Sequence, residues 1–155
     1  MLVSKLHEIF LENDPKQEKV ILTGCQKRDG IWDTLGYYDP KSWSINICEK
    51  EITDYVEILE RKRKRNKIYT RFCLRELVRL HEHAHSLFHT SKFEYIGCDF
   101  AMGYQNFPAT VEEPLVEFIA WSTVHYIGKE IFLSLFYEVD EDSPSYYKEW
   151  NKIIK

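Results

Sequence analysis

The sequence has little of what marks fibrous, disordered, secreted or membrane-spanning chains. Its 155 residues include only 6 Gly and 5 Pro, which excludes the collagen-like and low-complexity classes. No apolar run approaches the roughly 18 residues that a membrane span requires. The opening segment, MLVSKLHEIFLEND, carries a charge every few positions and lacks the apolar stretch of a secretory signal. We therefore expect a cytoplasmic protein with no membrane partner.

Cysteine is also sparse. The chain has four cysteines, which are scattered and form no C-x-x-C pair: Cys25, Cys48, Cys73 and Cys98. A disulfide-stabilised small domain would have denser cysteines, and a cysteine-based zinc site would have clustered ones. We therefore predict that all four are reduced thiols, as is usual in a cytoplasmic protein.

What the sequence does contain is enough bulky apolar surface for one hydrophobic core. Hydrophobic residues make up 44% of the chain and aromatic residues 15%, so wholesale disorder is excluded. The length is that of one domain, and no flexible linker or internal repeat divides it. We therefore expect residues 1–155 to form a single domain.

The N-terminal third predicts a helix and then a small antiparallel sheet. An apolar stripe at helical spacing covers residues 2–12, and residues 20–22 are a short strand candidate. Residues 31–38 and 43–48 are aromatic and β-branched runs on either side of a turn, which is typical of a β-hairpin. The second run alternates apolar and polar residues, so one face is expected to be buried and the other polar.

The remainder of the chain shows helical spacing. Apolar residues recur every three or four positions in four segments and in a last helix after an acidic turn: 52–59, 72–88, 111–127, 132–137 and 144–154. The pattern predicts an α+β fold with a small N-terminal sheet and a helical C-terminus.

The strongest chemical signal is the sequence His-Glu-His-Ala-His at residues 81–85, an H-E-x-x-H motif. Residues i and i+4 share one helical face, so His81 and His85 can direct ring nitrogens at one metal ion. Glu82 is placed to reach a water on that metal without binding the metal itself. The alternative is a helix with ordinary histidines. The apolar, helical context favours Zn²⁺.

Two further histidines lie close to the motif. His83 lies off the face of the motif and is expected to be an ordinary side chain. His89 lies one turn further along that face, where it would be a ligand, a partner that orients a ligand, or a packing residue. We favour the packing role for His89.

A catalytic zinc usually takes three protein ligands and leaves one position open for water. The segment VEEPLVEFIAW offers acidic residues on a second helix, and Glu117 is the first candidate because the small Ala120 permits close helix approach. Glu113 lies one turn earlier on the same face as an alternative ligand, or as a partner that orients a ligating histidine. A solvated N-terminal turn would also explain Glu112 and Glu113.

An H-E-x-x-H motif followed some thirty residues later by E-F-x-A resembles the gluzincin metallopeptidases. The E-F-x-A phrase is similar to that of MtfA-like and lethal-factor-type peptidases. The small size and the hairpin ahead of the motif resemble the ImmA/IrrE-like zincins. The resemblance implies a zincin-like fold and a zinc-dependent peptidase that hydrolyses a protein or peptide substrate, with Glu82 as general base and His81, His85 and Glu117 as ligands.

The same resemblance suggests where the substrate would lie. An extended peptide would pair with a sheet edge beside the metal helix, and the strand of Trp43, Ile45 and Ile47 is the candidate edge. A further donor would stabilise the oxyanion, with the candidates Tyr104, His125 and Tyr137.

A basic segment precedes the motif. Residues 61–79 carry nine Lys or Arg and one acid, whereas the whole chain has a net charge of -4. A solvated helix end explains this run best, and steering of acidic partners to the metal site is its simplest function. The competing function is a non-catalytic, metal-stabilised module that binds nucleic acid or an acidic protein through residues 61–79. Hydrolysis of a non-peptide amide is a third hypothesis. The sequence indicates neither the oligomeric state nor the substrate.

Overall fold

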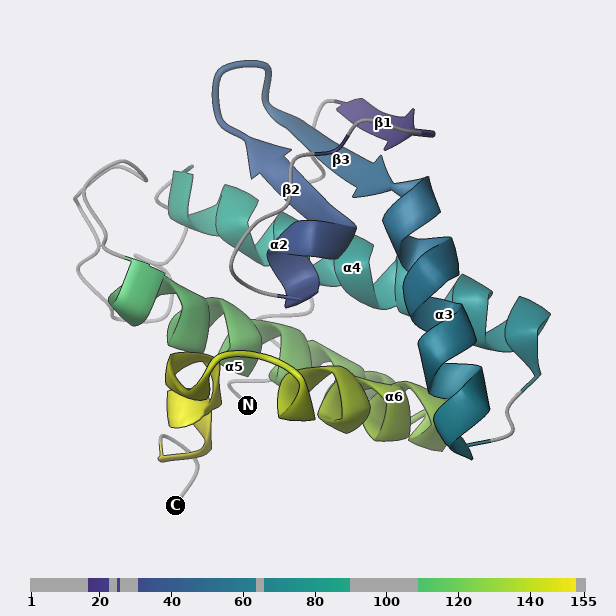
Figure 1. The fold of residues 1–155 in the computed structure, drawn as a ribbon. Helices are drawn as coiled ribbons and strands as arrows, with labels where there is room; N and C mark the ends of the chain where they lie inside the picture. The colour runs from purple at the N-terminus through teal and green to yellow at the C-terminus, as the bar shows by residue number, and fades with distance from the viewer. Residues whose placement is uncertain (1–16, 23–24, 26–30, 64–65, 90–108, 153–155) are drawn as a thin grey trace.

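The computed structural model describes residues 17–22, 25, 31–63, 66–89 and 109–152. Within these residues the chain forms three strands and several helices, in the α+β arrangement that the sequence predicts (Figure 1). The predicted N-terminal helix over residues 2–12 lies outside the described residues. None of the described helices combines the length and the apolar composition needed to cross a membrane.

A three-stranded mixed sheet occupies one side of the molecule (Figure 1). Strand β2 (Gly36–Asp39) and strand β3 (Ser44–Cys48) form the predicted antiparallel hairpin. Strand β1 (Gln17–Ile21) then pairs with β3 in parallel, with Ile21 opposite Cys48, so the sheet is mixed and the prediction of a wholly antiparallel sheet is corrected. The strand order is therefore β1-β3-β2, and β3 is the central strand.

Helix α4 (Lys67–His89) runs through the middle of the molecule and supports the other layers. The sheet lies on one side of α4, and α5 (Ala109–Ile127) and α6 (Glu130–Glu141) lie on the other (Figure 1). Asn66 caps the start of α4: its side-chain oxygen accepts a hydrogen bond from the Tyr69 amide at 3.1 Å.

Three shorter or flanking helices complete the fold. Helix α3 (Glu49–Arg63) follows β3 directly and packs against α4, with the predicted apolar stripe buried. Helix α2 (Ile31–Leu35) inserts the fully buried Trp32 between the sheet, α4 and α6. The last element, η3 (Ser145–Lys152), is a 3-10 helix that packs on α5 through the buried Trp150.

Two further predictions for the sheet are wrong. Residues 31–35 are helical, so the hairpin begins only at Gly36. The prediction of one polar face on the second strand also fails, because all five residues of β3 are buried. The polar side chains of β3 tolerate burial because they are hydrogen-bonded: the Asn46 amide donates to the Ser44 carbonyl and hydroxyl oxygens at 3.3 and 3.2 Å.

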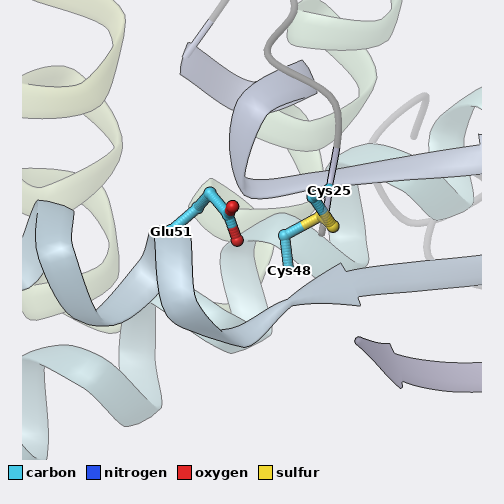
Figure 2. A group of neighbouring side chains, drawn as sticks. All are labelled: Cys25, Cys48 and Glu51. Atoms are coloured by element: carbon cyan, nitrogen blue, oxygen red, sulfur yellow. A yellow bond between two sulfur atoms is a disulfide. The ribbon is translucent and has the colours of Figure 1, made fainter. Parts of the chain in front are cut away.

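The prediction of four reduced thiols is wrong as well. Cys25 and Cys48 form a disulfide, and the described free thiol is the buried Cys73 (Figure 2). The reason is the parallel pairing of β1 with β3. It brings the segment after Ile21 to the end of β3, where Cys48 lies. Cys98 lies outside the described residues.

Candidate metal centre

The candidate site lies where the C-terminal half of α4 faces the N-terminal half of α5. His81 and His85 come from α4, and Glu113 comes from α5; one ligand atom from each lies within 4.8 Å of the others. The three side chains are almost completely buried, with 0%, 3% and 5% of their surface exposed. The predicted pairing of two motif histidines with an acid from the later helix is present in the structure.

The carboxylate of Glu113 faces both imidazoles. Its Oε2 lies 3.4 Å from Nε2 of His81, and its Oε1 lies 3.5 Å from Nε2 of His85. Glu113 Oε2 is buried and makes no hydrogen bond within the described residues. The Nε2 atoms of His81 and His85 therefore both face the carboxylate of Glu113.

The opposite ring nitrogens of the two histidines each meet another carboxylate. Nδ1 of His85 lies 2.7 Å from Glu112 Oε1, at hydrogen-bond distance, and Nδ1 of His81 lies 3.0 Å from Glu117 Oε1. A carboxylate oxygen accepts hydrogen bonds, so Nδ1–H of His85 donates to Glu112 Oε1, and loss of the proton from Nε2 would leave that nitrogen able to bind a metal. Sequence reasoning missed this role of Glu112, because a helix N-terminal acid is ordinarily solvated.

Helix α2 and strand β2 fix the site from the sheet side. The indole of Trp32 stacks on His81 with 5.2 Å between ring centroids and 9° between planes. Gly36 in β2 lies over α4, and a Cβ built there would come within 2.5 Å of Val78 and 3.5 Å of Glu82. Glycine therefore permits the close approach that places β2 next to Glu82.

Electrostatics distinguish the two acids of α5. Burial lowers the pKa of His81, but contacts with Glu113 and Glu117 outweigh it and raise the pKa to about 10. Burial also opposes ionisation of Glu113, yet the imidazoles of His85 and His81 hold its pKa well below the usual range. Burial raises the pKa of Glu117 to about 7, and contact with His81 offsets this only in part. Glu113 is thus the more firmly ionised of the two carboxylates.

The structure separates several predicted residues from this site. His125 is exposed near the end of α5 and stacks on Trp121, with 5.1 Å between ring centroids. The Tyr137 hydroxyl accepts a hydrogen bond from Trp121 at 2.9 Å. His83 faces a different, mostly apolar cavity of about 330 Å³. Tyr104 lies outside the described residues, as does the side chain of His89.

The proposed substrate strand is corrected. Trp43 immediately precedes β3, and Ile45 and Ile47 lie in it with their side chains in the core. Because β3 pairs with β1 on one side and β2 on the other, its backbone is already hydrogen-bonded along both edges. It therefore cannot take up a substrate strand.

The basic segment runs from the end of α3 along the N-terminal half of α4 and ends at Arg79, two residues before His81. Lys67 and His81 are 14 residues apart on one helix, which corresponds to about 21 Å. Five of its cations contact acids: Lys62, Lys67, Arg71, Arg75 and Arg79. These ion pairs are those expected of a solvated helical surface, and the steering of acidic partners to the metal centre stays a prediction.

Comparison of the chain with known protein families, with curated proteins and with solved structures found no match. The chemistry of the site therefore follows from its own geometry.

Proposed function

We propose that the chain is a zinc-dependent hydrolase of the metallopeptidase type, with His81, His85 and Glu113 as metal ligands. One observation carries the proposal. The two imidazoles of the H-E-x-x-H motif present Nε2 to a shared carboxylate, while a different carboxylate lies behind each Nδ1. Zinc-binding histidines are commonly oriented in this way by a carboxylate on the other ring nitrogen.

The distances support a zinc ion at this position. Zinc–nitrogen and zinc–oxygen bonds are about 2.0–2.2 Å long, so two ligands of a tetrahedral ion lie about 3.4 Å apart. The Glu113 oxygens lie 3.4 and 3.5 Å from the two Nε2 atoms, whereas Glu112 and Glu117 lie 2.7 and 3.0 Å from the Nδ1 atoms. The first pair fits shared coordination, and the second pair fits direct contact with the rings.

This geometry favours Glu113 as the third metal ligand. From the sequence we expected Glu117 to be that ligand. Glu117 contacts the ring nitrogen of His81 that points away from Glu113. A coordinating carboxylate must be ionised, and the pKa of Glu113 is held low whereas that of Glu117 is raised to about 7. We assign Glu117 to orienting His81.

Glu82 would act as the general base. It follows the first ligand on α4, is 1% exposed, and lies beneath β2 at Gly36. A zinc ion in such a site lowers the pKa of water towards about 7 and polarises a carbonyl group. Glu82 would accept the proton of the attacking water and pass it to the leaving amine.

Strand β2 is a better place for an extended peptide than β3. Among the described residues it is an edge strand of the sheet, and Gly36 brings it next to Glu82. Backbone hydrogen bonds to such an edge would align a peptide without requiring a particular side chain. We therefore propose an unfolded segment of protein as the substrate class.

The test is the Glu82→Gln variant. It should bind zinc as the wild type does, while hydrolysis of a fluorescently labelled unfolded protein falls by about 10²–10⁴-fold, the usual contribution of a general base. Glu76→Gln is the matched control, since Glu76 lies on the same helix and contacts Arg79. The peptidase proposal would be refuted if Glu82→Gln hydrolysed the labelled protein at the wild-type rate, or if the zinc-loaded wild type did not hydrolyse it.

The burial of the whole site favours a second candidate, a metal-stabilised module without catalysis. The residues Glu112, Glu113 and Glu117 are 5%, 5% and 0% exposed, which leaves little room for a substrate at the metal. In that case chelation would unfold the chain, and Glu82→Gln would change nothing. Any binding of nucleic acid or an acidic protein by residues 61–79 would then weaken when Arg61 and Lys62, both exposed, are replaced by Ala.

A further inference from the structure

A second cluster of ligating side chains lies at the junction of β3 and α3. Cys25 and Cys48 form a disulfide with 6.1 Å between Cα atoms, and the Glu51 carboxylate points at it (Figure 2). The two sulfurs and one Glu51 oxygen all lie within 4.8 Å of one another. Glu51 Oε2 is buried and makes no hydrogen bond within the described residues.

The local backbone favours negative charge at this position. Cys48 is the last residue of β3, and α3 begins at Glu49, so Cys48 and Glu51 lie at the amino end of a 15-residue helix. Backbone amides at such an end stabilise thiolates and carboxylates. Glu49 in the same turn contacts Arg71 and Arg75 instead, which leaves Glu51 as the acid that faces the sulfurs.

We propose that reduction of this disulfide creates a metal site in which Cys25, Cys48 and Glu51 bind a soft divalent cation such as Zn²⁺ or Cd²⁺. A dithiol reductant donates two electrons and two protons. The bond between the two sulfurs breaks, two thiols form, and the reductant becomes a disulfide. The cation then displaces both thiol protons, and two thiolates with one carboxylate bind it.

The chemistry of this donor set differs from that of the His81 site. Thiolates prefer Zn²⁺ and other soft cations, and three protein ligands leave a fourth position for water. In both redox states the same two cysteines join the segment after β1 to the start of α3. A small-molecule disulfide would reverse the step: it takes two electrons from the two thiolates and is itself reduced to two thiols, the bond between the protein sulfurs re-forms, and the cation is released. The redox state would thus decide whether the chain holds a second metal ion.

The experiment compares the full chain before and after reduction. Protein is reduced with dithiothreitol, freed of reductant without air, and titrated with Cd²⁺; the oxidised chain is titrated in parallel. We expect one additional equivalent of Cd²⁺ in the reduced chain, with a thiolate-to-cadmium charge-transfer band. Cys73, which is outside the disulfide, contributes one thiol to both samples. Thiols are counted before reduction to establish whether Cys98 also contributes a thiol to both samples.

Glu51→Gln isolates the third ligand while both cysteines remain. We expect the Cd²⁺ affinity of the reduced chain to fall at least tenfold, whereas Glu57→Gln, an exposed acid on the same helix, should leave it unchanged. Equal Cd²⁺ uptake by the oxidised and reduced chains would overturn the proposal, and so would loss of the helical circular dichroism on reduction. An unchanged affinity in Glu51→Gln would remove Glu51 from the site.

Discussion

The two halves of α4 carry charged side chains in opposite settings. In the N-terminal half, Lys67 and Arg71 are exposed and contact Glu60 and Glu49 on α3. In the C-terminal half the imidazole of His81 is fully buried and contacts carboxylates of α5. One helix thus holds a solvated set of ion pairs and a buried set about four turns apart.

The difference bears on the metal site that we propose for the buried set. Exposed ion pairs contribute roughly 0–1 kcal/mol each and form readily on any charged surface. Burying several ionisable groups is unfavourable unless they pair with one another or bind a metal. Three carboxylates and two imidazoles are buried together between α4 and α5, which is the kind of cluster that our proposed metal ion would stabilise.

The largest effect should come from the acid that we assign as ligand. Glu113→Gln should weaken zinc binding by more than about 100-fold, because it removes a charged ligand that faces both Nε2 atoms. Glu117→Gln should weaken it by about 10–100-fold, as expected for a residue that orients a ligating histidine. Competition with a fluorescent zinc chelator measures both affinities.

Glu112→Gln is the control for this pair of variants, because Glu112 contacts the Nδ1 atom of His85 as Glu117 contacts that of His81. Its effect should match that of Glu117→Gln. The opposite ranking, with Glu117→Gln losing zinc and Glu113→Gln retaining it, would restore the ligand set first expected from the sequence.

The ranking of these acids shows what the sequence predicts and what it does not. The spacing of His81 and His85 fixes them on one helical face, so this half of the site could be predicted. Glu113 and Glu117 are also four residues apart and share a face. Which of them faces the two Nε2 atoms, and which contacts Nδ1 of His81, depends on how far α5 is shifted along α4, and no local pattern encodes that shift.

The sheet illustrates the same limit. The β2–β3 hairpin is local, and the sequence predicts it apart from its first residues. The position of β1 is not local, because a parallel neighbour of β3 has no hairpin turn to mark it. The place of β3 as the central strand and the disulfide between Cys25 and Cys48 both follow from that pairing, so both were missed.

Gly36→Ala should destabilise the packing of β2 on the C-terminal, buried half of α4, and it should leave the exposed N-terminal half unchanged. The added Cβ would lie 2.5 Å from Val78 Cγ1 and 2.9 Å from the backbone oxygen of Asn46, so β2 must move away from α4. Overpacking of this kind costs about 1–3 kcal/mol, measured by urea unfolding. Zinc affinity should fall as well, because Glu82 and its neighbours lie under β2.

Gly128→Ala is the matched control. Gly128 has a φ of 71° and no atom within 4 Å of an added Cβ, so the substitution costs only backbone strain, about 1 kcal/mol. Zinc affinity should not change. If Gly36→Ala left both the free energy of unfolding and the zinc affinity unchanged, the tight contact between β2 and α4 would be disproved.

Zinc binding should depend on pH. The pKa of His81 is raised from 6.5 to about 10, so at pH 7–9 the metal-free protein holds His81 in its doubly protonated, positively charged form. A ligating imidazole must be neutral, without the extra proton. Zinc must displace that proton, and its apparent affinity should rise about tenfold per pH unit and level off near pH 10. Calorimetry in buffers of different ionisation enthalpy counts the protons released; no release at pH 8 would contradict the assignment.

The smallest effect should come from the exposed half of α4. Arg71→Ala removes a contact with Glu49, which Arg75 also approaches, at 3.8 Å, so the free energy of unfolding should fall by no more than about 1 kcal/mol. Added salt should reduce even this difference, because it screens exposed charges. Zinc affinity should equal that of the wild type, since Arg71 lies about 15 Å along the helix from His81. A loss of zinc affinity in Arg71→Ala would show that the two halves of α4 are coupled, and the metal centre would then have to be understood together with the basic segment.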